Sequence, residues 1–160
     1  HCFSECNKNT LMWSHYADKH RGFCIGIDET EFLESGVLAK VIYDDIDPGI
    51  KNEIISVSRN NPEEAGKVYE KLITHKHKDW AYEKEQRLIF NARDSSLLGR
   101  TYNIKPERFK KIYFGCKMPE KQKKLIVEIM GSQVRYYQTR TSNISSSLEI
   151  DELNLFSEGK

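Results

Sequence analysis

Two glutamates and an arginine stand close together in the stretch DWAYEKEQRLIF, residues 79–90. Side chains alternate between the two faces of an extended chain, so Glu83, Glu85 and Arg87 are expected to share one face. Leu88 and Phe90 then point to the other face and are expected to be buried in a central strand. Two carboxylates on one face raise each other's pKa unless a cation or hydroxyl is supplied, and such groups often mark functional sites. Carboxylates so placed can stabilise an oxocarbenium-like sugar cation or accept a hydrogen bond from a ribose hydroxyl.

A simpler interpretation of the same stretch is a solvated sheet edge. A Glu85–Arg87 pair at such an edge contributes less than about 1 kcal/mol to stability. Trp80 and Tyr82 come directly before the glutamates, however, and aromatic rings at that position could form the wall of a site. The sequence leaves both interpretations open.

A second cluster lies in MWSHYAD, residues 12–18, where Trp13, His15 and Tyr16 fall within about one and a half helical turns. Aromatic rings beside a histidine and a serine would suit a site that stacks a planar ligand. The alternative is that Trp13 and Tyr16 belong to the apolar stripe of a core helix, while His15 takes an ordinary hydrogen bond. Both interpretations stay open here as well.

The sequence gives less support for a metal site or for a dinucleotide-binding motif. Cys2, Cys6, His15 and His20 resemble a zinc set, but only eight residues separate the two pairs, where a helix-presented zinc finger has about twelve. The segment GFCIGID, residues 22–28, lacks the third glycine of a dinucleotide fingerprint. We therefore expect no metal site.

Length and composition set the broad class. The 160 residues suit a single domain over 1–160, and the first residue is histidine rather than methionine, so the chain is expected to lack an upstream segment. Twenty-five basic and 24 acidic side chains nearly balance. Residues 105–124 nevertheless hold eight basic against two acidic side chains, so a nucleic-acid partner is possible there.

No apolar run is long enough for a membrane span, and the four cysteines suit a reducing compartment, so a cytoplasmic protein without membrane contact is expected.

Periodicity and turn signals divide the chain into strands and helices. Strands are predicted at residues 1–5, 22–28, 38–45, 85–91, 100–105, 110–115, 133–139 and 147–153. Helices are predicted at residues 9–20, 28–36, 61–80 and 119–131. The strand at 22–28 is expected to be buried, and the last helix is expected to turn Leu125, Ile126, Ile129 and Met130 inward. The order of elements favours an α+β fold with a mixed, mainly antiparallel sheet and flanking helices.

Several motifs together resemble a known group of sequences. They are CFSE, N-x-LMWSHYAD-x-H-x-GFCIGID, a V-x-Y strand, W-x-YEKE-x-R and a late I-x-FG. This pattern resembles an uncharacterised bacterial family, one of the domains of unknown function, whose members usually carry an upstream segment that this chain is expected to lack. The overall pattern is also similar to the ADP-ribosyltransferase superfamily, in which a Glu-x-Glu pair precedes a strand. Gln86 and Arg87 depart from the apolar residues that many members have at that point.

The resemblance implies a fold and an activity. It implies an ADP-ribosyltransferase-like fold and a transferase or NAD-cleaving enzyme that acts in bacterial defence or toxicity, with NAD as the substrate. Glu85 would then stabilise the ribosyl cation, and Glu83 would orient the acceptor. The residues that would bind NAD are Ser4, Trp13, His15, Tyr16, Tyr82 and Arg87. The alternatives are a non-catalytic module that binds a nucleotide or nucleic acid through residues 105–124, and a plain interaction domain.

Overall fold

A computed structural model describes residues 1–28, 30, 37–45, 62–89 and 104–156. The chain divides into two compact units, each formed by two separate stretches. Unit 1 comprises His1–Glu5 and Gly36–Asn91, and unit 2 comprises Cys6–Ser35 and Ala92–Lys160. The fold class is α+β, as predicted. That residues 1–160 act as a single domain stays a prediction.

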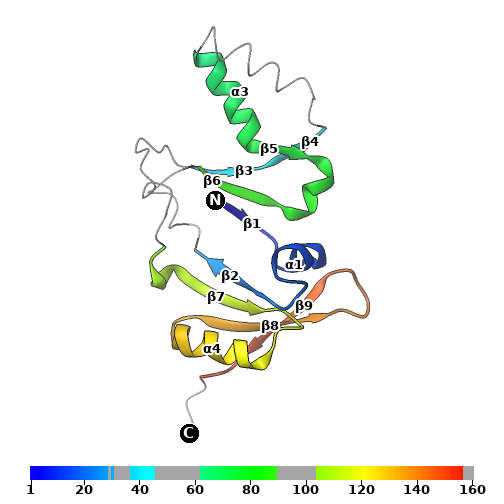
Figure 1. The fold of residues 1–160 in the computed structure, drawn as a ribbon, viewed down its shortest axis with the longest axis vertical. Helices are drawn as coiled ribbons and strands as arrows, with labels where there is room; N and C mark the ends of the chain where they lie inside the picture. Colours follow the sequence, from blue (N-terminus) through cyan, green and yellow to red (C-terminus); the bar gives the residue numbers. More distant parts are fainter. Residues whose placement is uncertain (29, 31–36, 46–61, 90–103, 157–160) are drawn as a thin grey trace. The chain divides into compact units, whose positions relative to one another are not determined.

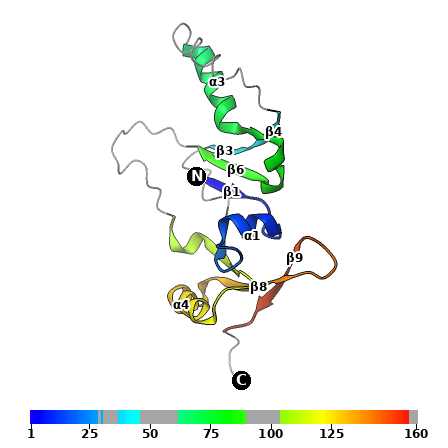
Figure 2. The same ribbon diagram turned by 45° about the vertical axis from the view of Figure 1, so that its right-hand side comes forward.

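Unit 2 is built on a four-stranded mixed sheet with the order β2-β7-β8-β9. The strands are β2 (Phe23–Ile27), β7 (Phe109–Phe114), β8 (Arg135–Thr141) and β9 (Leu148–Leu153). The β7 and β8 strands run parallel, because helix α4 (Glu120–Met130) connects them, and the other two pairs are antiparallel. Figures 1 and 2 show α4 on one side of this sheet and helix α1 (Thr10–Tyr16) on the other.

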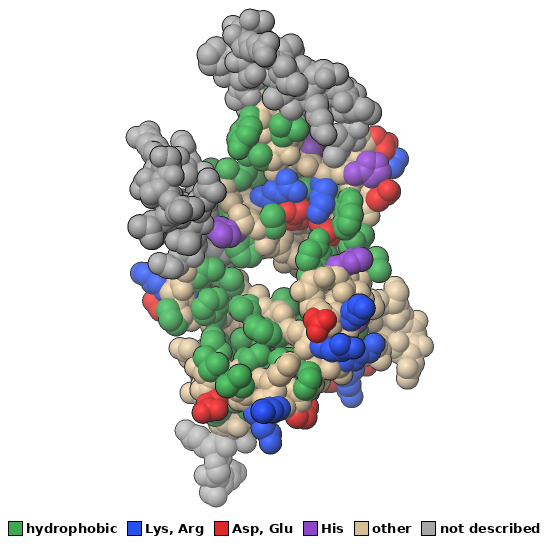
Figure 3. All heavy atoms as spheres, in the orientation of Figure 1, with side chains coloured by type: hydrophobic (Ala, Val, Ile, Leu, Met, Phe, Trp, Pro, Cys, Tyr) green, Lys and Arg blue, Asp and Glu red, His purple; other side chains and the backbone are tan. Residues whose placement is uncertain are grey.

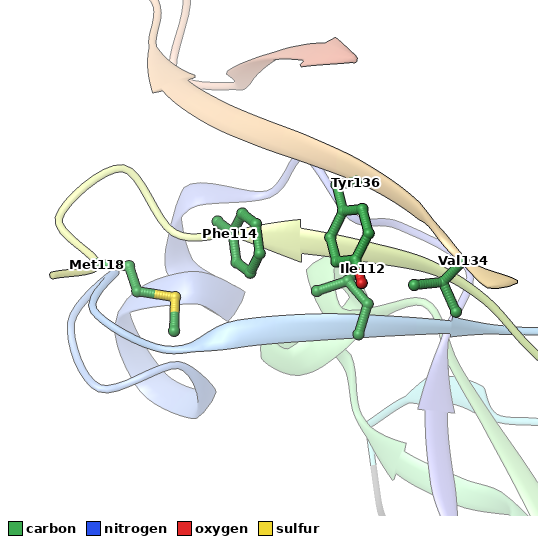
Figure 4. Packing of buried hydrophobic residues seen from close by; sticks show 5 residues of the cluster. All are labelled: Ile112, Phe114, Met118, Val134 and Tyr136. Carbon is green, nitrogen blue, oxygen red and sulfur yellow. The ribbon is translucent and has the colours of Figure 1, made fainter. Parts of the chain in front are cut away.

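Each face of this sheet has its own apolar cluster. On the α4 face, Ile112, Phe114, Met118, Val134 and Tyr136 pack together, as Figure 4 shows. The ring planes of Phe114 and Tyr136 are stacked with centroids 5.8 Å apart. Alternation along β7 turns Tyr113 to the other face, where it packs with Trp13, Ala17 and Leu148. The sheet is therefore the middle layer of a three-layer unit.

Unit 1 holds a three-stranded antiparallel sheet with the order β1-β6-β3. Its strands are β1 (Cys2–Ser4), β3 (Val37–Lys40) and β6 (Glu85–Ile89). A separate parallel ladder joins β4 (Ile42–Asp44) to β5 (His75–His77). Helix α3 (Pro62–Thr74) leads into β5, and the 3-10 helix Lys78–Glu83 leads into β6. The 3-10 helix Pro106–Arg108, which precedes β7, and the 3-10 helix Gly131–Gln133, which follows α4, belong to unit 2.

Most of the predicted elements that fall on described residues are present. The strand that carries Leu88 is central, and Leu88 is buried with 2 % of its surface exposed, as predicted. Phe90 lies outside the described residues, as do most of the helix predicted at 28–36 and of the strand predicted at 100–105. The α1 helix is capped by the Asn9 side chain, which accepts hydrogen bonds from the backbone N–H groups of Leu11 and Met12.

Three of these predictions were wrong in informative ways. The β2 strand lies at a sheet edge, so Phe23 and Ile25 remain more than 40 % exposed instead of buried. Helix α3 ends at Thr74, because the next three residues pair with β4 and the predicted helix at 61–80 is cut short. In α4, Leu125 and Ile129 are exposed, and the helix packs on the sheet through Ile126, Val127 and Met130.

One isoleucine pair in unit 2 tests this assignment of the core. Ile112 is 1 % exposed, whereas Ile129 is 69 % exposed on α4. Replacing Ile112 with alanine leaves a cavity and should lower the free energy of unfolding by about 2–5 kcal/mol. Replacing Ile129 with alanine should change it by no more than about 0.5 kcal/mol. Urea denaturation followed by circular dichroism measures both, and equal losses would contradict the burial described above.

Candidate functional site

The two glutamates of the YEKE motif are both buried in unit 1, but they do not lie on one strand. Glu83 ends the 3-10 helix and is 3 % exposed, and Glu85 begins β6 and is 7 % exposed. Lys84 between them has the left-handed backbone angles φ 45° and ψ 51°, which residues other than glycine adopt at some cost. The predicted alternation therefore holds for Glu85 and Arg87, while a sharp turn places Glu83.

A single lysine joins the two carboxylates. Lys76 comes from the middle of β5, opposite Tyr43 in the parallel ladder. Its ammonium donates a hydrogen bond to Oε2 of Glu83 and another, at 3.3 Å, to Oε2 of Glu85. The same ammonium lies 4.9 Å from the centroid of the Trp80 ring. Two carboxylates and an aromatic face thus surround one cation.

Arg87 holds Glu85 from the other side. Its Nε donates to Oε1 of Glu85 at 2.9 Å, and its Nη2 donates to Oε2 at 3.1 Å. This paired arrangement matches the planar fork of arginine to the carboxylate and is among the stronger hydrogen-bonding geometries. Nη1 donates to the backbone carbonyl of Ile73 at 2.7 Å, which ties the end of α3 to the same cluster.

Backbone contacts fix the positions of the two glutamates. The backbone N–H of Glu85 donates to the phenolic oxygen of Tyr43 at 2.7 Å. The Ser4 hydroxyl donates to the backbone carbonyl of Glu83 at 2.6 Å. Four strands therefore contribute to the site: β1 through Ser4, β4 through Tyr43, β5 through Lys76, and β6 through Glu85 and Arg87. We name this set of residues, Tyr43, Lys76, Glu83, Glu85 and Arg87, the charge cluster.

The protonation state of Glu85 follows from these contacts. Burial raises the pKa of Glu85. Hydrogen bonds from Arg87 and from the Cys2 thiol, together with the charges of Arg87 and Lys76, lower it by more, so that the net pKa is about 2. Burial also lowers the pKa of Lys76, yet the two glutamates raise it more. The hydrogen bond to Glu85 raises the pKa of Arg87. Both cations and the Glu85 carboxylate are charged at neutral pH.

This arrangement limits the chemistry that Glu85 can perform. A carboxyl group with a pKa near 2 is a poor proton donor or acceptor at neutral pH, because general acid–base groups work best near the operating pH. It retains its negative charge, so it can act on a substrate through electrostatics. In Figure 3, basic and acidic side chains lie next to one another in the region of β5 and β6.

The other predicted site residues are divided between the two units. Tyr82, which lies in unit 1 with Ser4 and Arg87, has its ring centroid 6.0 Å from that of Trp80. The remaining three, Trp13, His15 and Tyr16, belong to unit 2. Trp13 is only 3 % exposed, and its Nε1–H donates to the carbonyl of Asn7, so it contributes to the core. His15 and Tyr16 are exposed on α1, with ring centroids 6.3 Å apart.

Unit 2 contains a separate serine–histidine contact. The Ser14 hydroxyl and Nε2 of His20 are 3.0 Å apart. His20 is buried, and burial, with the charge of Lys117, lowers its pKa. Its Nδ1 has no hydrogen-bond partner among the described residues. The contact joins α1 to the turn that follows it.

The basic residues at 105–124 are spread over several elements. Lys110 and Lys111 are consecutive in β7 and therefore point to opposite faces of the sheet. Lys123 pairs with Glu120 at 2.6 Å on α4. A nucleic-acid partner for this segment stays a prediction.

Metal binding and membrane crossing can be examined in the described part of the chain. There, no group of three or more His, Cys, Asp or Glu side chains is arranged to hold a metal ion. Within the same residues, no helix is both long and apolar enough to cross a membrane.

The sequence analysis did not identify Lys76 or Tyr43 as site residues. Lys76 stands in THKHKDW, where the preceding helical pattern predicts a longer helix. It reaches the glutamates only because β5 pairs in parallel with β4, a contact between residues more than 30 positions apart. A possible signal was the need for a cation beside two buried carboxylates, but that need does not say which of the many lysines supplies it.

Comparison with known proteins gives one match. Residues 12–88 match a family described as "Protein of unknown function (DUF2971)". This is a family of the uncharacterised kind that the motifs indicated. Neither the curated proteins nor the solved structures include a significant match to the chain.

The charge cluster predicts how stability depends on pH. The pKa of Glu85 is lowered from 4.5 to about 2 on folding, so its contribution is complete above about pH 4.5 and is lost as the pH falls towards 2. Glu85→Gln should lower the free energy of unfolding at pH 7 by about 3–5 kcal/mol, because it removes a buried carboxylate and leaves the partly buried Lys76 and Arg87 incompletely paired. The difference between wild type and variant should shrink across that acidic window.

A matched control uses the same substitution at an exposed pair. Glu120 is 75 % exposed in its pair with Lys123, so Glu120→Gln should cost less than about 1 kcal/mol. Urea titrations at several pH values measure all three proteins. A pH-independent difference between wild type and Glu85→Gln would show that the charge of Glu85 is not what stabilises the cluster.

Proposed function

We propose that the charge cluster is the active centre of an ADP-ribosyltransferase-like domain that cleaves NAD at its nicotinamide–ribose bond. In that reaction the C–N bond breaks, nicotinamide leaves with the bonding electron pair, and an acceptor attacks the ribosyl cation that forms. A site that favours positive charge lowers the barrier to this step, because charge develops on the ribose in the transition state.

The observation that carries the proposal is the environment of the Lys76 ammonium. Carboxylates from Glu83 and Glu85 and the ring of Trp80 lie around it, and each of these groups attracts a cation. Lysine has a long, flexible side chain, and that of Lys76 is 24 % exposed. We infer that Lys76 occupies the cation site at rest and moves out when a substrate enters.

The charges that remain support this role. Without Lys76, the two carboxylates and the Arg87 guanidinium leave one net negative charge in a largely buried site. The nicotinamide ring of NAD carries a positive charge, and the ribosyl cation that follows carries one too. Arg87 would keep Glu85 ionised and in place, and Glu83 would orient an acceptor.

The second candidate is a module that binds a nucleotide without cleaving it. It is favoured by the saturation of Glu85, whose oxygens already accept three hydrogen bonds from Arg87 and Lys76. A carboxylate so engaged has little capacity left for a ribose hydroxyl. Trp80, which is 40 % exposed, and Tyr82 could still stack with a planar ring.

Nicotinamide release and NAD binding, measured separately, distinguish the two functions. We expect the 160-residue chain to release nicotinamide from NAD. Glu85→Gln should slow that release by about a hundredfold, because one well-placed electrostatic group contributes on the order of 3 kcal/mol to a barrier. NAD binding by calorimetry without nicotinamide release would instead support the binding module.

A stability-matched control is needed because Glu85→Gln also weakens the fold. Leu88 lies on the same strand and is 2 % exposed, but it faces away from Glu85 and Arg87. Leu88→Ala should cost a similar stability of about 2–5 kcal/mol and leave turnover nearly unchanged at a temperature where both variants are folded. Equal loss of turnover in the two variants would remove Glu85 from the chemistry.

A further inference from the structure

Unit 2 contains a cavity that the proposed chemistry does not use. It lies between α4 and the strands β8 and β9, and its volume is about 1100 Å³. Known small-molecule sites occupy roughly 300–1,000 Å³, so the cavity can admit a whole small ligand. All of its lining residues belong to the described part of unit 2.

One part of the cavity wall is apolar. Phe114 from β7, Val127 from α4 and Leu153 and Leu155 from the end of the chain contribute to it. Phe114 is 1 % exposed and anchored in the core cluster, whereas Leu155 is 47 % exposed. The apolar part therefore runs from a fixed floor to an open rim, which suits the body of a hydrophobic ligand.

The α4 side of the cavity has more hydrogen-bond donors than partners. The side chain of Lys123 is only 15 % exposed, and among the described residues its ammonium contacts one group, Glu120. Because an ammonium has three donors, two remain for a ligand. Lys124 also lines the cavity, and no described carboxylate pairs with it. Both lysines lie in the first half of α4.

Three further charged residues line the cavity: Arg140, Glu128 and Glu120. Arg140 lines the cavity and pairs with Asp151 through Nε at 2.6 Å and Nη2 at 2.8 Å, which leaves Nη1 unengaged by described residues. Glu128 also lines the cavity, one helical turn after Lys124, and would oppose an anion. Glu120, the partner of Lys123, also lines the cavity. Because Lys123, Lys124 and Arg140 still have donors that no described residue engages, an acceptor would complement this lining better than another cation.

We propose that this cavity binds a small amphipathic anion, with an apolar body over Phe114 and Val127 and a carboxylate against Lys123 and Lys124. The site is independent of the charge cluster, which lies in unit 1. Its residues also follow residue 88, so they lie beyond the segment that matches the family.

Calorimetric titration of the chain with decanoate tests the proposal. We expect saturable binding with one site. Lys124→Gln should weaken it by about tenfold, because a charge-assisted hydrogen bond is lost. Glu128→Gln should strengthen it by about threefold, because a repelling charge is removed. Lys121→Gln, on an exposed lysine of the same helix that does not line the cavity, should change it by less than about twofold.

Lys124→Gln and Glu128→Gln are expected to change decanoate affinity in opposite directions, which a general loss of folding would not do. Decylamine has the same apolar body and a positive charge, so it should bind more weakly than decanoate. Absence of saturable decanoate binding would overturn the proposal, and so would tighter binding of decylamine. Equal weakening by Lys121→Gln and Lys124→Gln would also overturn it, because it would indicate the diffuse attraction of a polyanion such as nucleic acid to the basic helix.

Discussion

Burial of two carboxylates in unit 1 is the constraint on which its local structure depends. An ionised carboxylate taken out of water is costly unless cations and hydrogen-bond donors replace the lost hydration. Glu83 and Glu85 receive these from Lys76 and Arg87. Lys76 reaches them from β5 and Arg87 from β6, so the ionic contacts require the parallel ladder, the 3-10 helix and the central strand to form together.

The same constraint shapes the chemistry available to the cluster. Each contact that makes burial of Glu85 tolerable also holds its pKa low and occupies its oxygens. Glu85 is therefore poorly suited to transfer a proton, and it is well suited to act through its fixed negative charge. Lys76 is the member whose removal changes the charge of the cluster with the least rearrangement, because Arg87 is also tied to the backbone of Ile73.

The features that could be predicted are those that the local order of apolar and polar residues determines. Alternation along β6 gave the shared face of Glu85 and Arg87 and the burial of Leu88. The contact of Glu83 with Lys76 depends on a left-handed Lys84 and on a parallel strand pair, and neither leaves a periodic signal. The β2 strand was misjudged for a similar reason. Apolar residues on both faces of a strand are typical of burial, but the position of a strand within its sheet depends on partners elsewhere in the chain.

The family match crosses the boundaries of the structural units. Residues 12–88 supply most of α1 and all of β2 to unit 2. Trp13 of α1, however, packs against Tyr113 and Leu148, which lie outside that segment. Strand β6 likewise pairs with β1, at residues 2–4. The matched segment alone would leave the face of α1 and one edge of β6 without their partners in this chain. The contacts of the matched segment therefore extend beyond it in both directions. Experiments on the function of this segment need a chain that includes β1 and β7–β9.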